Sequence, residues 1–464
     1  MMKHILPLII AFVFAFATFM SGCTDGTVNR SEELKEVLET AQANLNDAFS
    51  EESCDYALIS EFLKSWAEGC NVEVEKAASH YTVLYNPATE DGTDKKVTTL
   101  QCALHTDDIQ GDLNALSTAL ACLLGPTEHN GIRLIVTDIY HRELLGAAAV
   151  DKKYLNCDGF INLSNSSDYS LHVAGADTAR AVIQTSAKKK APAYGSAFEI
   201  TMSFNKFADP FRFDKKNNYP DPIRTIGDLL AGAKSSGKLF EIASFTSEAD
   251  PGYLPHKVKA VVVLDANSVE SLNSRFEKSY KSVENKFDNV DSDFVYTINE
   301  TEVPSSVLSE KASNELISLM YTLKTGICEQ DEETGLIYSA SYLSSISTKD
   351  KVKVTVDIRT RGTDYMNALS NDYETTSGLC NMKYSISDSH PAWTSSDDSE
   401  LAGYFSNLVP LAEGTSDIML PMNELDLFAK KNTKLNAIAY SFAKDGSKNV
   451  MRNITNYLDA SEEE

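Results

Sequence analysis

The pattern of apolar and polar positions divides the chain into two regions that favour different secondary structure. In the first region, residues 31–49 and 56–70 repeat apolar side chains at the spacing of an α-helix. Short alternating segments and continuous apolar runs follow them. The elements predicted there are strands at 72–77, 81–88, 96–104, 131–139 and 159–165, and a helix over 113–124. Strands that alternate with helices indicate an α/β layer with a mostly parallel sheet.

Beyond about Ala176 the pattern changes to separate strands divided by longer helical segments. The predicted elements are strands at 197–207, 239–245, 258–266 and 351–361, and a helix over 268–287. This order is typical of an α+β domain with an antiparallel sheet. From residue 389 onward helix and strand alternate again, so we predict that this part completes the first domain. The expected division is an α/β domain of residues 31–177 and 389–464, interrupted by a lid domain of residues 178–388.

The N-terminus has the pattern of an export signal. Lys3 and His4 precede an apolar run of 16 residues that stops at Ser21-Gly22-Cys23. This ending resembles the bacterial lipobox, so residues 1–23 are predicted to be a signal peptide with a lipidated Cys23, and residues 24–30 a tether. The alternative is a transmembrane anchor, but the run is shorter than the roughly 20 residues that span a bilayer. The expected location is the bacterial cell envelope, on the periplasmic or cell-surface side, with the lipid as the membrane partner.

Charge and cysteine content narrow the class of protein further. A formal net charge of −25 and a pI near 4.7 argue against nucleic acid and anionic headgroups as partners. Eight cysteines leave seven besides Cys23, and none of them forms a C-x-x-C pair. Cys102 and Cys122 lie in apolar stretches and are expected to be small core residues. Cys54 and Cys70 could form a disulfide in an oxidising compartment or remain free thiols.

Several segments, in this order, resemble one family of enzymes. They are "FLKSWAEGCNVEVEKAASHYTVLYNPATEDGTDKKVTTLQC", "HNGIRLIVTDIYHRELLGAAAV", "GFINLSNSS", "GLIYSASYLSSISTKDKVKVTVDIRTR" and "SHPAW". The ordered set resembles the aminoacyl-histidine dipeptidases (Xaa-His dipeptidases, carnosinase-like) of the two-zinc metallopeptidase clan. The resemblance covers most of the mature chain and implies a zinc-peptidase-like α/β domain interrupted by a lid. It also leads us to expect a homodimer formed through the lid.

The resemblance implies a metal site whose ligands this sequence has mostly replaced. Two adjacent zinc ions need a bridging carboxylate and further His and carboxylate ligands. The family's strand "gln-gly-his-leu-asp" corresponds to residues 101–105, which places Ala103 at the first histidine and His105 at the aspartate. The bridging aspartate falls near Asp112.

The remaining family positions are also altered. The paired glutamates, one the general base and one a ligand, fall on Tyr140 and His141, and the aspartate of "asn-leu-asp" falls on Ser164. The family's last ligand is a histidine near the C-terminus, and this chain has no histidine after His390. No catalytic residue of the family is therefore matched, and no cofactor is expected.

A rebuilt metal site is the alternative. His105-Thr106-Asp107 is an H-x-D sequence displaced by two residues, which keeps the same face of a strand. The metal-capable groups in this neighbourhood are His105, Asp107, Asp112, His141 and Glu143. Under this alternative the protein is an active dipeptidase or related amidohydrolase, with zinc as its cofactor.

One arginine is a candidate ligand-binding residue. Arg359 and Arg361 close a lid strand in "DIRTR", and the resemblance implies that such an arginine can face a ligand carboxylate. The alternative is an exposed surface pair. The leading interpretation of the whole sequence is a membrane-tethered, non-catalytic pseudo-peptidase that binds a peptide or a protein partner between its two domains. A third interpretation is an interaction subunit that works through its surface.

Overall fold

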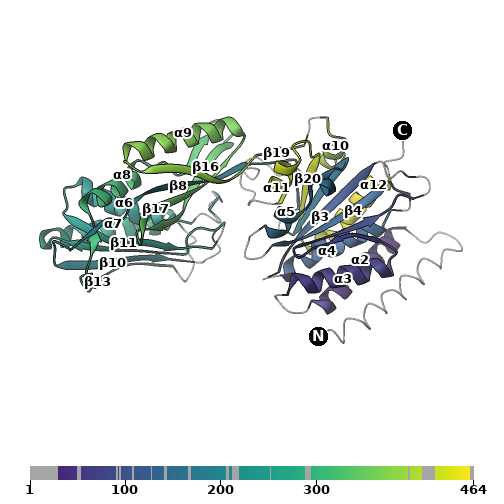
Figure 1. Cartoon of the computed structure of the whole chain (residues 1–464), viewed down its shortest axis with the longest axis horizontal. Helices are drawn as coiled ribbons and strands as arrows, with labels where there is room; N and C mark the ends of the chain where they lie inside the picture. The colour runs from purple at the N-terminus through teal and green to yellow at the C-terminus, as the bar shows by residue number, and fades with distance from the viewer. Residues whose placement is uncertain are drawn as a thin grey trace. The chain divides into compact units, whose positions relative to one another are not determined.

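The structure is a computed structural model, and it divides the chain into two compact units (Figure 1). The residues that it describes are 30–49, 54–89, 92, 96–106, 109–126, 128–139, 144–165, 169–204, 208, 210–211, 219–250, 252–287, 294–395, 398–409 and 424–459. The described part of unit 1 lies within residues 30–175, 393–409 and 424–459, and that of unit 2 within residues 176–392. The boundaries predicted from the sequence are 177/178 and 388/389.

Unit 1 contains most of the predicted α/β elements. Its helices are α2 (Arg30–Ala48), α3 (Tyr56–Gly69), η1 (Ile109–Gly111), α4 (Leu113–Leu124), α5 (Leu145–Ala149), η2 (Lys152–Leu155), α10 (Glu400–Ser406), α11 (Glu424–Lys431), η5 (Lys444–Gly446) and α12 (Ser447–Asp459). Its strands are β1 (Glu73–Ala77), β2 (Tyr81–Asn86), β3 (Val97–His105), β4 (Gly131–Ile139), β5 (Gly159–Asn165), β6 (Ser170–His172), β7 (Ala174–Gly175), β19 (Trp393–Thr394) and β20 (Ala437–Phe442). Hydrophobic periodicity was sufficient to find the long elements, because each buries one continuous apolar stripe or run.

Seven strands form one sheet in the order β1-β2-β4-β3-β5-β20-β6. The four central strands are parallel, whereas β1 with β2, β2 with β4 and β20 with β6 are antiparallel. The sheet is therefore mixed, with a parallel centre and antiparallel edges. The reason at one edge is the connection: only residues 78–80 join β1 to β2, and so short a link allows a hairpin but no parallel crossover. The α/β fold class is confirmed.

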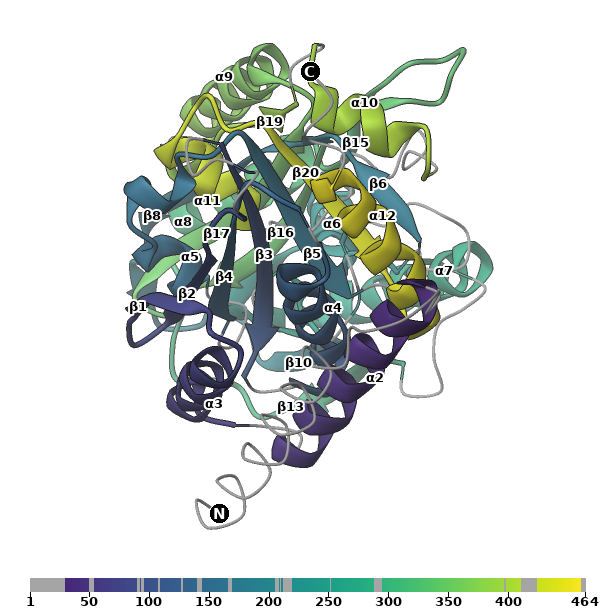
Figure 2. The ribbon, with the colours of Figure 1, turned by 90° about the vertical axis from the view of Figure 1, so that its right-hand side faces the viewer.

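The two faces of this sheet have separate cores. Residues such as Leu100, Val136 and Tyr440 point to the face covered by α2, α3, α4, α10 and α12. Helices α2, α4 and α12 lie in front of the strands in Figure 2. Residues such as Ile135 and Phe160 point to the opposite face, where Leu425 and Phe428 of α11 pack with residues of α5 and η2. Both faces are covered, as expected for a sheet with a parallel centre.

Unit 2 is an α+β unit, as predicted. Its helices are α6 (Pro222–Ser235), η3 (Ala266–Ser268), α7 (Val269–Lys286), α8 (Glu310–Thr322) and α9 (Thr363–Leu379). Its strands are β8 (Asp177–Ser186), β9 (Lys189–Lys190), β10 (Ser196–Ser203), β11 (Phe240–Glu248), β12 (Lys257–Leu264), β13 (Val295–Thr301), β14 (Val307–Leu308), β15 (Gly326–Gln330), β16 (Ile337–Ser347), β17 (Lys351–Thr360) and β18 (Lys383–His390). They form a four-stranded sheet (β11-β12-β10-β13), a five-stranded sheet (β15-β16-β17-β8-β18) and a two-stranded sheet (β14-β9), all antiparallel.

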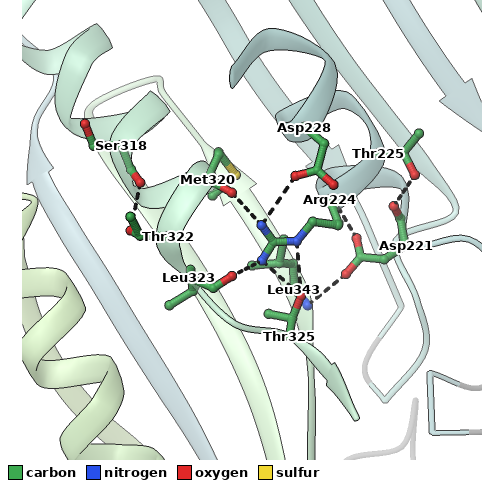
Figure 3. A network of polar contacts seen from close by, with 10 residues as sticks. All are labelled: Asp221, Arg224, Thr225, Asp228, Ser318, Met320, Thr322, Leu323, Thr325 and Leu343. Carbon is green, nitrogen blue, oxygen red and sulfur yellow. Dashed lines mark hydrogen bonds and ion pairs between the residues drawn. The ribbon is translucent and has the colours of Figure 1, made fainter. Parts of the chain in front are cut away.

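A polar network connects α6, α8 and β16 inside unit 2 (Figure 3). The Arg224 guanidinium donates to the backbone carbonyls of Met320 and Leu323 at the C-terminal end of α8 and to the Thr325 hydroxyl. Asp221 caps α6 by accepting the Arg224 N–H at 2.9 Å and also accepts the Leu343 N–H of β16 at 3.2 Å. The carbonyls at a helix end have no partner within the helix, so Arg224 satisfies groups that the fold would otherwise bury unpaired.

Two predictions from the sequence concern a disulfide and the membrane. Cys54 and Cys70 are both free thiols, so the disulfide that their compartment would permit is not formed in the structure. Across the described residues, no helix is both long and apolar enough to cross a membrane. The export signal, Cys23 and the tether to residue 29 lie outside the described residues.

Candidate functional site

The carboxyl ends of four parallel strands meet at one edge of the unit 1 sheet. β3, β4, β5 and β20 run in the same direction, with Ala103 opposite Thr137, Gln101 opposite Asn162 and Ser164 opposite Ser441. In α/β sheets, ligands bind at this edge. It is therefore the place to look for a site in unit 1.

A hydrogen-bond network of uncharged side chains runs along this part of the sheet toward one carboxylate. The Asn162 amide donates to the Gln101 side-chain carbonyl, and the Gln101 amide donates to Thr137 Oγ1 at 3.0 Å and to Glu424 Oε2. Thr137 Oγ1 lies 2.6 Å from Glu424 Oε2. All four side chains are at least nine-tenths buried. The network therefore holds the first residue of α11 against β3 and β4.

Glu424 is an unusual carboxylate because it is 2% exposed. Burial raises the pKa of its carboxyl from 4.5 to about 7, against the lowering effect of the hydrogen bonds from Thr137 and Gln101. His105 also lowers this pKa, and Asp112 raises it. Both network donors reach Oε2, whereas Oε1 is buried and has no hydrogen-bond partner among the described residues. A carboxyl that titrates near neutral pH can exchange a proton with a ligand, which is the property a general acid or base needs.

The structure brings together two of the metal-ligand candidates. Asp112 Oδ2 accepts the backbone N–H of His105 at 2.7 Å and lies 2.8 Å from His105 Nδ1. The His105 side chain is 42% exposed, and that of Asp112 is 13% exposed. Among the residues that the structure describes, no three His, Cys, Asp or Glu side chains are grouped to hold a metal ion. The candidates Asp107, His141 and Glu143, and Tyr140, lie outside the described residues.

Two further positions at which the sequence resemblance predicts zinc ligands lie in the described part of the chain, and they carry alanine and serine. Ala103 has no donor atom, and the Ser164 hydroxyl lies 2.9 Å from the Ser441 hydroxyl. His105 and Asp112 are paired with each other. The donor set in this part of the chain therefore does not fit a two-zinc centre.

A second histidine–aspartate pair, not predicted from the sequence, lies near the same edge. Asp138, 4% exposed, accepts the Thr106 hydroxyl at 2.9 Å and lies 2.9 Å from His80 Nδ1. Sequence reasoning also missed Glu424, which is separated from Thr137 by 287 positions. The only local signal for Glu424 is an acidic residue that opens the amphipathic segment "ELDLFAKK", a common pattern at a helix start.

Arg359, the ligand-binding candidate in unit 2, is buried rather than part of an exposed surface pair. It is 6% exposed, and its Cζ lies 4.2 Å from the centroid of the Phe211 ring. It is in register with Thr178 of β8, which in turn is in register with His390 of β18. Residues directly opposite each other on neighbouring strands share a face of the sheet. Arg359, Thr178 and His390 thus form a polar row across β17, β8 and β18.

The neighbouring row of this face is an ion-pair network. Arg180 binds Asp357 through Nε at 2.7 Å and Nη2 at 3.0 Å, and the Tyr342 hydroxyl donates to the same carboxylate at 2.9 Å. These bonds raise the pKa of the Arg180 guanidinium further above its ordinary value. Asp357 thus has several partners of its own.

Comparison with known proteins gives a structural likeness only. No family model matches the chain, and no curated protein sequence matches it significantly. The aminoacylhistidine dipeptidase of Vibrio alginolyticus superposes with a TM-score of 0.68 at 16% identity, covering 93% of this chain and 97% of that one. The aminopeptidase PepT of Bacillus cereus gives a TM-score of 0.46 at 11% identity, covering 94% of this chain and 99% of that one. Human carnosine dipeptidase 1 gives a TM-score of 0.41 at 9% identity, covering 93% of this chain and 98% of that one.

Identity this low establishes shape and no more. The first similarity spans nearly the full length of both chains, and it agrees with the resemblance found in the sequence. The chain therefore has the fold of the aminoacylhistidine dipeptidases.

Proposed function

We propose that this protein is a lipid-anchored, non-catalytic relative of the dipeptidases that binds a peptide or a protein partner. The observation that carries the proposal is the composition of the strand edge where a metallopeptidase of this fold needs its ligands. Ala103 and Ser164 stand at two of those positions, and His105 and Asp112 bind each other. Tyr140 and His141 stand at the base and ligand positions in the sequence. Two-metal hydrolysis depends on these groups acting together, so the loss of even one is costly.

The test of the non-catalytic part is metal analysis beside an activity assay. The purified mature protein should hold less than one zinc ion per chain and should not cleave Xaa-His dipeptides with added zinc, cobalt or manganese. A protein that lacks the general base alone would lose roughly 10²- to 10⁴-fold in rate. Stoichiometric metal with metal-dependent turnover that is lost in His105→Ala or Asp112→Ala would refute the proposal.

An active hydrolase with a rebuilt site is the second candidate, and Glu424 is the observation that favours it. Its pKa of about 7 and its place beside the carboxyl ends of β3 and β4 suit a proton-transferring group. Under this candidate, Glu424→Gln would abolish turnover in the same assay. Under the leading proposal, there is no turnover for the substitution to change.

The polar row in unit 2 supports recognition of a ligand carboxylate. Arg359 supplies a guanidinium fork, which matches a carboxylate in geometry, and Thr178 supplies a buried hydroxyl that has no hydrogen-bond partner among the described residues. Hydrogen bonds to charged groups contribute roughly 1.5–3 kcal/mol, which corresponds to about 10- to 100-fold in affinity.

Calorimetric titration with Ala-His and with its C-terminal amide tests this part. We expect Ala-His to bind more tightly than the amide, and Arg359→Met to remove that difference. Arg359→Lys should recover only part of it, because lysine keeps the charge but lacks the fork. Arg275→Met on α7 is the matched control and should behave like the unaltered protein. Equal binding of acid and amide would rule out a carboxylate site at Arg359.

The lipid anchor is tested separately from the site. Cys23→Ser should release the protein from membranes, because the thiol that would carry the lipid is absent. Membrane association that survives the substitution would instead favour an uncleaved anchor.

A further inference from the structure

The hydrogen bond between Glu424 and Thr137 can run in either direction. Thr137 Oγ1 lies 2.6 Å from Glu424 Oε2 and 3.3 Å from the backbone carbonyl of Cys102. When Glu424 is charged, the Thr137 hydroxyl donates to Oε2. When Oε2 gains a proton, Glu424 can donate to Thr137 Oγ1, and the hydroxyl can turn to the Cys102 carbonyl. Both states keep every hydroxyl proton bonded, so the network accommodates either form of the carboxyl.

The two states differ in what they leave buried. In the charged state a full negative charge is buried, and no described residue forms a hydrogen bond with Oε1. In the protonated state no net charge is buried. Because a buried charge with incomplete hydrogen bonding is costly, the charged state favours a movement that exposes the carboxylate to water.

We propose that the Glu424–Thr137 pair is a proton-operated switch that sets how firmly the first turn of α11 is held on the sheet. Glu424 is the first residue of α11, so exposing its carboxylate requires this turn to leave β3 and β4. The other end of the helix has its own anchors. Phe428 packs on Phe160 at 5.4 Å between ring centroids, and Lys431 Nζ donates to the carbonyls of Ala147, Ala148 and Val150. Deprotonation therefore loosens the start of α11 while its end stays attached.

Charged and titratable groups reach Glu424 from several elements. Among the described residues, those that interact electrostatically with Glu424 are His105 and Cys102 of β3, Asp112 before α4 and Tyr56 of α3. The 3-10 helix η2, which packs against α11, carries Lys152 and Lys153, and α11 itself carries Asp426, Lys430 and Lys431. The described α5 and β19 segments contribute none. Burial raises the pKa values of Tyr56 and Cys102 well above neutral. Both groups therefore stay uncharged across the range in which Glu424 responds.

Hydrogen exchange of the full mature protein tests the switch. The informative amides are those of Phe428 and Ala429, whose helical acceptors are the carbonyls four residues earlier. Their protection factors, corrected for intrinsic exchange, should fall about 25-fold between pH 5.5 and pH 8, because the pKa moves from about 7 when docked to 4.5 when exposed. In Glu424→Gln the protection should be independent of pH over this range.

Two variants of Thr137 keep the test decisive if Glu424→Gln does not fold. Thr137→Ser retains the hydroxyl and should behave like the unaltered chain. Thr137→Val removes a donor that lowers the pKa of docked Glu424, so protection should continue to fall to a higher pH than in the unaltered chain. Protection that is flat with pH in the unaltered chain, or an identical pH midpoint in the serine and valine variants, would overturn the proposal. This result would leave the proposed binding function untouched.

Discussion

Replacing Arg224 with methionine should destabilise unit 2 by about 3–5 kcal/mol, because breaking a buried charged network leaves its partners unpaired. The Arg224 side chain is 19% exposed, so water replaces few of its bonds. It donates to two carbonyls at the end of α8 and to the Thr325 hydroxyl (Figure 3). Methionine replaces the aliphatic part of arginine but has no donor, so the two carbonyls would lose their partner. Lysine keeps one charge but not the planar fork, so Arg224→Lys should recover about half of the loss.

The urea dependence of amide exchange in α8 measures this effect within unit 2. Asp228→Asn is the matched control: it removes an ion pair at 3.6 Å whose carboxylate is 61% exposed, and it should cost less than about 1 kcal/mol. Tryptophan fluorescence gives a second control, because Trp66 and Trp393 are the only two tryptophans and both belong to unit 1. A cost below about 1 kcal/mol for Arg224→Met, or full stability in Arg224→Lys, would refute the argument that the fork completes the end of α8.

Three further substitutions test other parts of unit 1. Because the Glu424 pKa is raised in the folded state, its contribution to stability is fully present below about pH 4.5 and is lost as pH rises through 7. The free energy of unfolding of Glu424→Gln, relative to that of the unaltered chain, should therefore increase by about 3 kcal/mol between pH 4.5 and pH 8. Urea denaturation at the two pH values measures this difference. Lys431→Met should cost about 2–4 kcal/mol by the same measurement, because three carbonyls at the C-terminal end of α5 lose a charged donor; unchanged stability would contradict this. Gly146→Ala should destabilise unit 1 by more than about 2 kcal/mol, because the added Cβ would lie 2.4 Å from the backbone nitrogen of Asp138 and 2.5 Å from the carbonyl oxygen of His80. A soluble variant with the original unfolding midpoint would show that the backbone can move aside.

The secondary structure followed from the sequence because its causes are local. The run "GIRLIVTDI" became β4, buried at all nine positions, and the amphipathic segment after Ser268 became α7. Alternation of such elements was enough to predict the α/β and α+β classes. The antiparallel edges of the first sheet were not foreseen, because strand direction depends on which strands meet and on how short their links are.

Part of the candidate site could be predicted from residue identity, and part was decided only by the tertiary structure. Residue identity alone indicated that Ala103 and Ser164 supply no imidazole, thiolate or carboxylate, the usual ligands of zinc, and no arrangement in space changes that. His105 and Asp112 are close in the sequence, but only the folded structure shows that the Asp112 carboxylate binds the backbone N–H and the ring of His105. The roles of Asp107, Tyr140, His141 and Glu143 stay predictions.

What only the tertiary structure decided is the environment of each polar group. Glu424 is one of many acidic residues in a chain of net charge −25, and its sequence surroundings indicate only the start of a helix. Its pKa is raised because the fold buries it against Gln101 and Thr137, which are 323 and 287 positions away. The sequence likewise left open whether Arg359 is an exposed surface residue, whereas in the structure its guanidinium packs over the Phe211 ring. Hydrophobic periodicity specifies which face of an element is buried, but burial, dielectric surroundings and hydrogen-bond partners are set by the elements that pack against that face.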